Sequence, residues 1–419
     1  MSTFDVAVIG AGAAGLAAAR ALEGSGLSVT ILEAAPRIGG RARTDTASFA
    51  QPWDLGCHWM HSALDNPFVA IADRLGFSYR RSTQHYIRRL HLGTRWASDE
   101  ERDAAADAVE AAFAAVTEAG KAGRDVAASD VIADAGQWNR LVRHWVGLMT
   151  AATPQDVSTL DFANYHDGGE NWPVVEGYGA LVAAQARGLA VTLNCPVQTV
   201  DWSGPGVRLA TPKGDVTARI VIVAVSTDVM AKGHLRFAPA LPPDLAEAME
   251  ALPLGVSEKV AFGFDSDVFG FTERAGINTI DLTRPDRAPV NFQILPGARP
   301  LAIAHLGGAA GRALVGAGPQ AMADFALAGL TDVFGADIRA RVTAWRATSW
   351  ARDPHIGGGY SCALPGKAHM RGRLFAPLAE RIVFAGEAVS EHAFSTCHGA
   401  HLSGQAAARS VISLLKGTA

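Results

Sequence analysis

The most constraining feature of this chain is a short apolar strand that runs directly into a glycine-rich turn and then an alanine-rich helix. The turn after residues 4–9 contains three glycines, Gly10, Gly12 and Gly15. In a βαβ unit the first glycine permits the tight turn, the second lets a pyrophosphate approach the backbone, and the third lets the helix pack closely on the strand. A second apolar strand, residues 28–32, ends on Glu33, where a carboxylate can hold a ribose hydroxyl. The pattern predicts a dinucleotide site; the alternative is an ordinary βαβ turn without a nucleotide.

Composition excludes several classes of protein. The chain has 419 residues, of which 49% are hydrophobic and 19% charged, enough for two or three domains of a globular enzyme. The net charge of −4 gives no reason to expect nucleic acid or an anionic membrane as partner. The first strand begins by residue 4, and no apolar run reaches about 20 residues. We therefore expect neither a signal peptide nor a membrane helix, and a cytoplasmic location.

The cysteines do not indicate a disulfide scaffold. The four of them are Cys57, Cys195, Cys362 and Cys397, and none forms a CxxC pair, which favours reduced thiols. Segments 57–61 and 397–401 each contain one cysteine and two histidines, and together they could supply zinc ligands. Their spacing matches no familiar zinc module, so no metal site is predicted.

The order of the predicted elements is discontinuous. Helical patterns cover residues 66–76 and most of 99–150, where an alanine-rich stretch predicts an amphipathic surface helix; strand patterns recur between 190 and 225, near 259–264 and 300–305, and at 381–385 before a long final helix. We predict an α/β protein in which a Rossmann-like domain is interleaved with an α+β domain. The predicted bounds are 1–75, 178–235 and 355–419 for the first domain, and 76–177 and 236–354 for the second.

A second glycine cluster, residues 307–311, follows a predicted strand but lacks the G-x-G spacing. We interpret it as a plain turn, so a second dinucleotide site for NAD(P)H is not expected.

Two further motifs lie near the two ends of the chain. After Glu33 the chain continues with Arg37-Ile-Gly39-Gly40-Arg41-Ala-Arg-Thr44, and near its end it has Phe384-Ala385-Gly386-Glu387-Ala388 followed by Ser395-Thr396-Cys397-His398-Gly399. In this order the motifs resemble those of the flavin-containing amine oxidases, the monoamine and polyamine oxidase superfamily. The resemblance runs from residue 4 to about residue 413. It implies FAD held without a covalent bond, because Gly359 stands where monoamine oxidases carry the cysteine that bonds the flavin.

The resemblance also implies positions around the cofactor. Arg41 would lie against the pyrophosphate, Glu387 would meet the ribityl-pyrophosphate, and Val197 would face the adenine through its backbone. Residues 56–59 would lie along the flavin. The predicted cofactor-binding residues are therefore Gly10, Gly12, Ala14, Gly15, Glu33, Arg41, Gly56, Cys57, His58, Trp59, Val197, Gly386, Glu387 and Thr396.

For the reaction, the resemblance implies hydride transfer from the carbon beside an amine nitrogen to the flavin. The imine is then hydrolysed to an aldehyde and an amine, and O₂ reoxidises the flavin to give hydrogen peroxide. Because the amine must be neutral, a dry and apolar slot is expected. Three catalytic residues are implied. Lys259 would hold a water against the flavin, His61 would accept a proton, and Tyr360 would form one wall of an aromatic cage.

Three further residues are predicted to bind substrate, Trp350, Thr396 and Glu170, with Asp167 as a second acidic candidate for a distal ammonium. Residues 54–67 resemble the polyamine oxidase branch, so a polyamine is the favoured substrate and O₂ the electron acceptor. A monoamine, a diamine such as putrescine, and an amino acid remain alternatives. A histone demethylase is not favoured, because the chain shows no long helical insertion.

An alternative of another class is a flavin-free binding module like the Rab GDP-dissociation inhibitors. The intact glycines, Glu33 and Arg41 argue against that alternative. The sequence leaves the oligomeric state open between monomer and homodimer.

Overall fold

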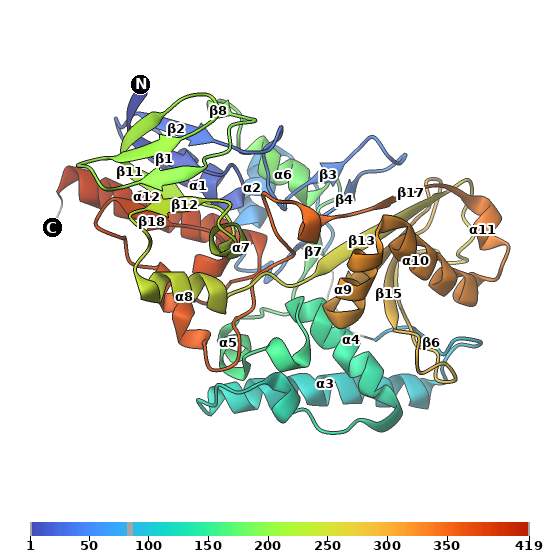
Figure 1. Ribbon diagram of the computed structural model, residues 1–419. Helices are drawn as coiled ribbons and strands as arrows, with labels where there is room; N and C mark the ends of the chain where they lie inside the picture. Colours follow the sequence, from blue (N-terminus) through green and yellow to red (C-terminus); the bar gives the residue numbers. More distant parts are fainter. Residues whose placement is uncertain (1, 82–86, 418–419) are drawn as a thin grey trace.

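The computed structural model describes residues 2–81 and 87–417, and two β-sheets form its frame (Figure 1). The first sheet has eight strands in the order β12-β9-β10-β11-β1-β2-β8, with β18 paired to β11. Its strands are β1 (Ser2–Ile9), β2 (Val29–Leu32), β8 (Val191–Thr192), β9 (Thr199–Asp201), β10 (Val207–Ala210), β11 (Val216–Val223), β12 (Arg236–Ala238) and β18 (Ile382–Phe384). Strands β2, β1, β11 and β18 run parallel, which confirms the predicted Rossmann-like α/β fold. Strand β12 joins this sheet although it follows the predicted boundary at residue 235.

Glycines allow the two ends of the chain to pack together on this sheet. Helix α1 (Ala13–Leu22) follows β1, and a Cβ at Gly15 would lie only 1.9 Å from the Gly10 carbonyl oxygen. Helix α12 (Cys397–Lys416) packs on α1, where a Cβ at Gly404 would lie 2.1 Å from the Ala14 carbonyl oxygen. Any larger residue at Gly15 or Gly404 would separate these elements, so close approach explains both glycines.

The second sheet is almost entirely antiparallel and runs β17-β13-β16-β15-β14-β6. Its strands are β6 (Leu90–His91), β13 (Ser257–Phe264), β14 (Ala275–Thr279), β15 (Val290–Leu295), β16 (Leu301–Gly307) and β17 (Val342–Ala347). Helices α9 (Gly308–Ala317) and α10 (Pro319–Phe334) pack on it, over a core that includes Phe262, Phe292 and Leu330.

A helical layer completes this part of the molecule (Figure 1). It contains α3 (Asp99–Lys121), α4 (Asn139–Thr150) and α5 (Thr159–Asn164). Helix α3 starts with a capping box between Ser98 and Glu101, and it buries Ala105, Val109 and Ala112 at helical spacing. The amphipathic helix predicted from the alanine-rich stretch is therefore confirmed.

The remaining regular elements are short. They are α2 (Pro67–Leu75), α6 (Tyr178–Ala184), α7 (Thr227–Ala231), α8 (Pro243–Ala251) and α11 (Ile338–Arg341), with the strand pairs β3 (Thr44–Asp45) and β4 (Trp53–Asp54), and β5 (Trp59–Met60) and β7 (Trp172–Pro173). Within residues 2–81 and 87–417, no helix combines the length and the apolar character needed to cross a membrane.

The expected plain turn at residues 307–311 is wrong. Helix α9 begins at Gly308, directly after β16, and Gly307 is its N-cap. A Cβ at Gly307 would lie 2.5 Å from the Gly147 carbonyl oxygen, and one at Gly308 would lie 3.0 Å from the Gly147 Cα. These glycines therefore let α9 approach α4 closely. In the sequence, glycines required for such packing look the same as glycines required for a turn.

A buried ion pair joins the helical layer to the C-terminal segment. Arg371 donates from Nε to Asp161 Oδ1 (2.6 Å) and from Nη2 to Asp161 Oδ2 (2.8 Å). Its Nη1 also donates to Ser361 Oγ (3.0 Å), and both charged side chains are buried. The two-pronged geometry and full burial make this pair a structural tie between segments that are distant in sequence.

Arg371→Met is expected to reduce the free energy of unfolding by about 3–5 kcal/mol, because it leaves the Asp161 carboxylate buried without its cation. Urea denaturation of the purified protein measures the loss. Arg208→Met is the matched control, since Arg208 pairs with Asp201 and Asp215 at an exposed surface site. Equal shifts of the denaturation midpoint in the two variants would contradict the assigned role.

Candidate active site

A cavity of about 1080 Å³ is lined by residues of both sheets and of the helical layer. Gly12 and Glu33 line it from the loops that follow β1 and β2, and Lys259 and His305 line it from the second sheet. Every residue predicted for the site lines this cavity except Gly15 and Glu170. The volume lies just above the usual range of about 300–1,000 Å³ for ligand pockets, as expected of a site that takes a dinucleotide together with a substrate.

The glycine loop leaves room for a pyrophosphate. Gly12 is the N-cap of α1 and no side chain caps this helix, so its first N–H groups are open to an anion. A Cβ added at Gly12 would meet nothing within 4 Å. Glu33 Oε2 accepts a hydrogen bond from Ala11 N (2.6 Å), and its Oε1 accepts one from Ala35 N (2.8 Å). An ionised carboxylate still has lone pairs for a ribose hydroxyl, so these residues fit FAD.

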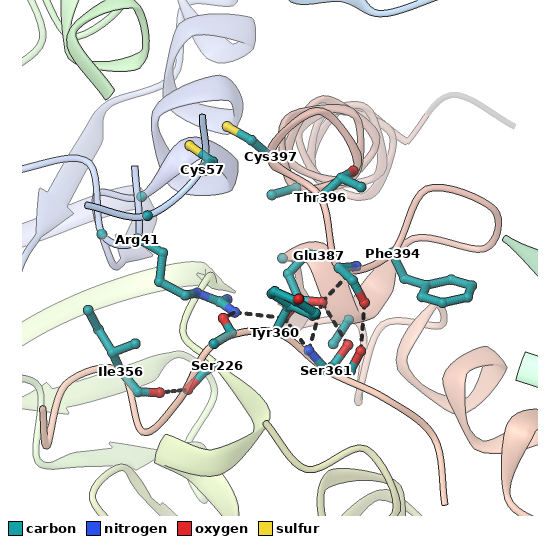
Figure 2. Close-up of a pocket in the computed structure, with 18 of the residues that line it drawn as sticks. Arg41, Cys57, Ser226, Ile356, Tyr360, Ser361, Glu387, Phe394, Thr396 and Cys397 are labelled. Atoms are coloured by element: carbon teal, nitrogen blue, oxygen red, sulfur yellow. Dashed lines mark hydrogen bonds and ion pairs between the residues drawn. The ribbon is translucent and has the colours of Figure 1, made fainter. Parts of the chain in front are cut away.

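Arg41 and Glu387 form an ion pair at the edge of the cavity (Figure 2). Arg41 Nη1 donates to Glu387 Oε1 (2.9 Å) and to the Gly359 carbonyl oxygen (2.6 Å). Burial raises the pKa of Glu387, but the charge of Arg41 and the hydrogen bond from Ser361 outweigh that effect and the pKa is below its usual value. The carboxylate therefore stays ionised and fixes the Arg41 guanidinium. This guanidinium is the group that we predict to bind the pyrophosphate.

Cys57 and Cys397 lie next to each other in the cavity wall (Figure 2). Both thiols are free. A hydrogen bond to Cys397, together with burial, raises the pKa of the Cys57 thiol well above its usual value. Cys57 therefore stays a neutral thiol and serves as packing beside the predicted flavin position.

Lys259 on β13 extends its amine toward the loop that precedes β5. Its Nζ donates to the carbonyl oxygens of Gly56 (2.6 Å) and Asp54 (3.0 Å). Burial lowers its pKa from 10.5 to about 8. An ammonium has three N–H donors, so two fix the lysine and one remains for a water or ligand in the cavity.

His58 has neighbours at both ring nitrogens. Its Nδ1 lies 3.2 Å from Asp54 Oδ2, and its Nε2 lies 3.0 Å from the side-chain amide nitrogen of Gln293. Burial lowers the pKa of the imidazole despite the nearby Asp54 carboxylate. The ring packs edge-on against Trp59 at 4.7 Å between centroids, so His58 orients the tryptophan that lines the cavity.

The three predicted wall residues are each held by a hydrogen bond. The Tyr360 hydroxyl donates to the Leu148 carbonyl oxygen, and burial raises the pKa of Tyr360 to about 12. Trp350 Nε1 donates to the Leu55 carbonyl oxygen (3.2 Å). The Thr396 hydroxyl donates to the Ala393 carbonyl oxygen (2.6 Å) and caps α12 by accepting from Gly399 N (3.0 Å). All three present a fixed surface to the cavity.

The acidic candidates differ in position. His61 Nδ1 lies 2.5 Å from Asn171 Oδ1, and burial lowers the pKa of this histidine below 6.5. Asp167 lines the cavity together with His61. Glu170 accepts a hydrogen bond from Trp172 Nε1 (2.9 Å) and is not among the residues that line the cavity. The geometry therefore favours Asp167 over Glu170 as the partner of a distal ammonium.

Sequence reasoning missed His305 on β16. Its ring stacks on Trp59 at 5.7 Å between centroids, and it lines the cavity. A histidine within the apolar strand Leu301–Gly307 was the available signal, but one such residue does not say which face of the sheet it occupies. Within the described part of the chain, no group of three or more His, Cys, Asp or Glu side chains is arranged to hold a metal ion.

Comparison with known families gives one match over nearly the entire chain. The model of the flavin-containing amine oxidoreductases matches residues 13–412. Polyamine oxidase 4 of Oryza sativa subsp. japonica is 27% identical over 442 residues, which cover 96% of this chain and 88% of that protein. Lysine-specific histone demethylase 2 of Homo sapiens is 26% identical over 451 residues, but this chain spans only 52% of its length.

Solved structures agree on the fold. Cyclohexylamine oxidase from Brevibacterium oxydans IH-35A superposes with a TM-score of 0.82 at 22% identity, covering 99% of both chains. Wild-type putrescine oxidase bound to putrescine superposes with a TM-score of 0.80 at 20% identity, covering 98% of this chain and 99% of that one. Two oxidases of different amines thus share this architecture.

Gly12→Ala is expected to fold normally but to bind FAD at least about tenfold more weakly, because the new methyl group occupies space that the chain itself leaves open. Titration of the apoprotein with FAD measures the affinity, and thermal unfolding of the apoprotein tests the fold. Gly15→Ala is the contrasting variant, since its methyl group meets the Gly10 carbonyl and destabilises the apoprotein. Unchanged FAD affinity in Gly12→Ala would overturn this placement of the pyrophosphate.

Proposed function

The chain belongs to the family of flavin-containing amine oxidoreductases and is an FAD-dependent amine oxidase, and from that premise we propose the reaction that it catalyses. An amine, O₂ and water are converted into an aldehyde, a smaller amine or ammonia, and hydrogen peroxide. The observation that carries this proposal is that one cavity joins the glycine loop and Glu33 to Lys259 and Trp59. The family assignment excludes the flavin-free binding module.

The protein's part in this reaction is to orient a neutral amine and exclude water. FAD, when bound non-covalently, supplies the hydride acceptor and passes the electrons on to O₂. Trp59, Tyr360 and Trp350 give the cavity aromatic walls, which favour the uncharged amine by disfavouring its ammonium form. His61 is uncharged at neutral pH because its pKa lies below 6.5, so it is able to accept the proton that the substrate amine loses.

A polyamine is the favoured substrate in this proposal. The support is the similarity to a plant polyamine oxidase over most of both chains, together with the position of Asp167 in the cavity wall. A carboxylate there would accept a distal ammonium while the reacting nitrogen lies between the aromatic walls. A monoamine, a diamine such as putrescine, or an amino acid is the alternative substrate.

A panel of amines tests the proposal. The FAD-loaded protein is mixed anaerobically with spermine, spermidine, putrescine, cyclohexylamine and an amino acid, and flavin bleaching is followed in the stopped flow. Oxygen is then admitted and peroxide is measured against aldehyde. The expected result is bleaching by amines, fastest with a polyamine, and equal yields of peroxide and aldehyde. Failure of every amine to reduce the flavin would contradict the proposal.

Lys259→Met is expected to slow the reoxidation of reduced flavin by O₂ roughly a hundredfold while FAD stays bound, because it removes a preorganised cation and donor. In the wild-type protein the reoxidation rate should fall as pH rises through about 8, where Lys259 loses its proton. This pH dependence should be absent from the variant. Stopped-flow mixing of the reduced protein with O₂ at several pH values provides the measurement.

Lys213→Met is the control for this variant, since Lys213 is an exposed lysine whose Nζ donates to the Leu193 carbonyl oxygen outside the cavity. It should leave reoxidation unchanged. Oxygen kinetics of Lys259→Met that match the wild type at every pH would remove Lys259 from the oxidative half of the reaction.

A further inference from the structure

A row of polar side chains crosses the second sheet on the face that lines the cavity. Lys259 on β13 pairs with His305 on β16, His305 pairs with Asn291 on β15, and Asn291 pairs with Asn278 on β14. Residues directly opposite one another in antiparallel strands project from the same face, with Cβ atoms about 5 Å apart. We call these four residues the polar row. The first three line the cavity, and Asn278 is buried behind them.

Apolar side chains lie beside the polar row on β16. Ile303 and Leu301 lie two and four residues from His305 on the same strand and belong to a hydrophobic cluster. Burying a polar side chain in such surroundings is unfavourable unless it is hydrogen-bonded. Asn291 satisfies this requirement in part, because its Nδ2 donates to Asn278 Oδ1 (3.2 Å).

His305 does not satisfy this requirement through the protein. Its Nε2 has no hydrogen-bond partner among residues 2–81 and 87–417. Its ring is fixed by stacking on Trp59, so it cannot turn freely toward another partner. The ring also lines the cavity, so a ligand there is placed to supply a hydrogen-bond partner that the described residues do not.

The electrostatic surroundings define that partner. Burial, together with the positive charges of Lys259 and of any protonated His58 or His144, lowers the pKa of His305 well below 6.5, so its ring is uncharged. The polar row contains no carboxylate. The nearby Asp54 carboxylate is held by Thr44, His58 and the backbone N–H groups of Tyr178 and Gly179, and it does not line the cavity. A second ammonium would therefore meet an uncompensated positive field at His305.

We propose that the polar row is a subsite for an uncharged hydrogen-bonding group of the amine substrate, such as a hydroxyl or an amide, and that the His305 ring binds it. His305 is the cross-strand neighbour of Lys259, so this group lies a few bonds from the oxidised carbon. Any additional ammonium of the same substrate lies instead toward Asp167. The inference rests on the proposed function and specifies the substrate class of that same cavity.

Three amines with a common four-carbon chain test the subsite: butylamine, aminobutanol and diaminobutane. The wild-type protein should show a kcat/KM for aminobutanol at least about tenfold above that for butylamine, as expected when one buried polar group is paired or left unpaired. In His305→Phe this ratio should fall to about one, mainly through the loss with aminobutanol. His305→Gln retains a hydrogen-bonding group and should keep part of the preference.

His401→Phe is the matched control. His401 is a buried histidine on α12 whose Nδ1 has no hydrogen-bond partner in the part of the chain that the structure describes, and it packs on Phe68 outside the cavity. The same substitution there should leave the ratio unchanged. The FAD content of each purified variant verifies that the fold is retained.

Binding of dead-end analogues separates failure of the inference from failure of the proposed function. In these analogues the carbon beside the amine carries two methyl groups and no hydrogen, so no oxidation takes place. The wild-type protein should bind the hydroxylated analogue more tightly than the plain one by flavin difference spectroscopy, and His305→Phe should bind both equally. Equal or absent binding in the wild type, or a preference that survives in His305→Phe, overturns the inference. A diaminobutane preference that His305→Phe abolishes also overturns it, because the subsite would then take a cation.

Discussion

The structure depends on a series of linked charged and hydroxyl side chains, most of them buried, that runs from Arg41 to the helical layer. Arg41 binds Glu387, Glu387 accepts from the Ser361 hydroxyl, Ser361 accepts from Arg371, and Arg371 pairs with Asp161. These residues come from three distant parts of the chain, at 41, 161 and 361–387, and all of them except Arg371 line the cavity. Each charge is matched by a neighbour, which is the condition for keeping charges in a protein interior. Arg41, which we predict to bind the pyrophosphate, is thus positioned by contacts that continue to the helical layer.

The cofactor half of the site could be predicted because local backbone geometry dictates its residues. Gly15 must be glycine since a Cβ would overlap the Gly10 carbonyl, and Glu33 must follow a strand to reach the loop. These constraints act within about 25 residues, so they leave a readable spacing in the sequence. The same holds for α3, whose capping box and helical periodicity are local. Longer-range facts, such as the packing of Gly404 on Ala14, explain a glycine only once both helices are placed.

The substrate half could not be predicted to the same degree, because strand register decides which of its side chains face the cavity. His305 faces the cavity only because β16 pairs with β13 in the register that sets it opposite Lys259, and a shift of one residue would turn it to the other face. Glu170 and Asp167 are three residues apart in one loop, yet only the latter lines the cavity. The glycines at 307 and 308 serve contact with α4, which no local pattern indicates. Such information resides in tertiary contacts between distant segments.

The groups that line the cavity differ in charge, and that difference constrains how an amine can lie in it. Asp167 offers a carboxylate and His61 an imidazole with a lowered pKa, whereas Lys259 offers a cation and His305 an uncharged ring. An amine with a charged end and an uncharged polar end gains favourable contacts in only one of its two orientations. If the reacting carbon faces the flavin as proposed, we expect this asymmetry to select which carbon–nitrogen bond is presented. The selectivity of the reaction would then follow from the charge pattern of the cavity walls as well as from its shape.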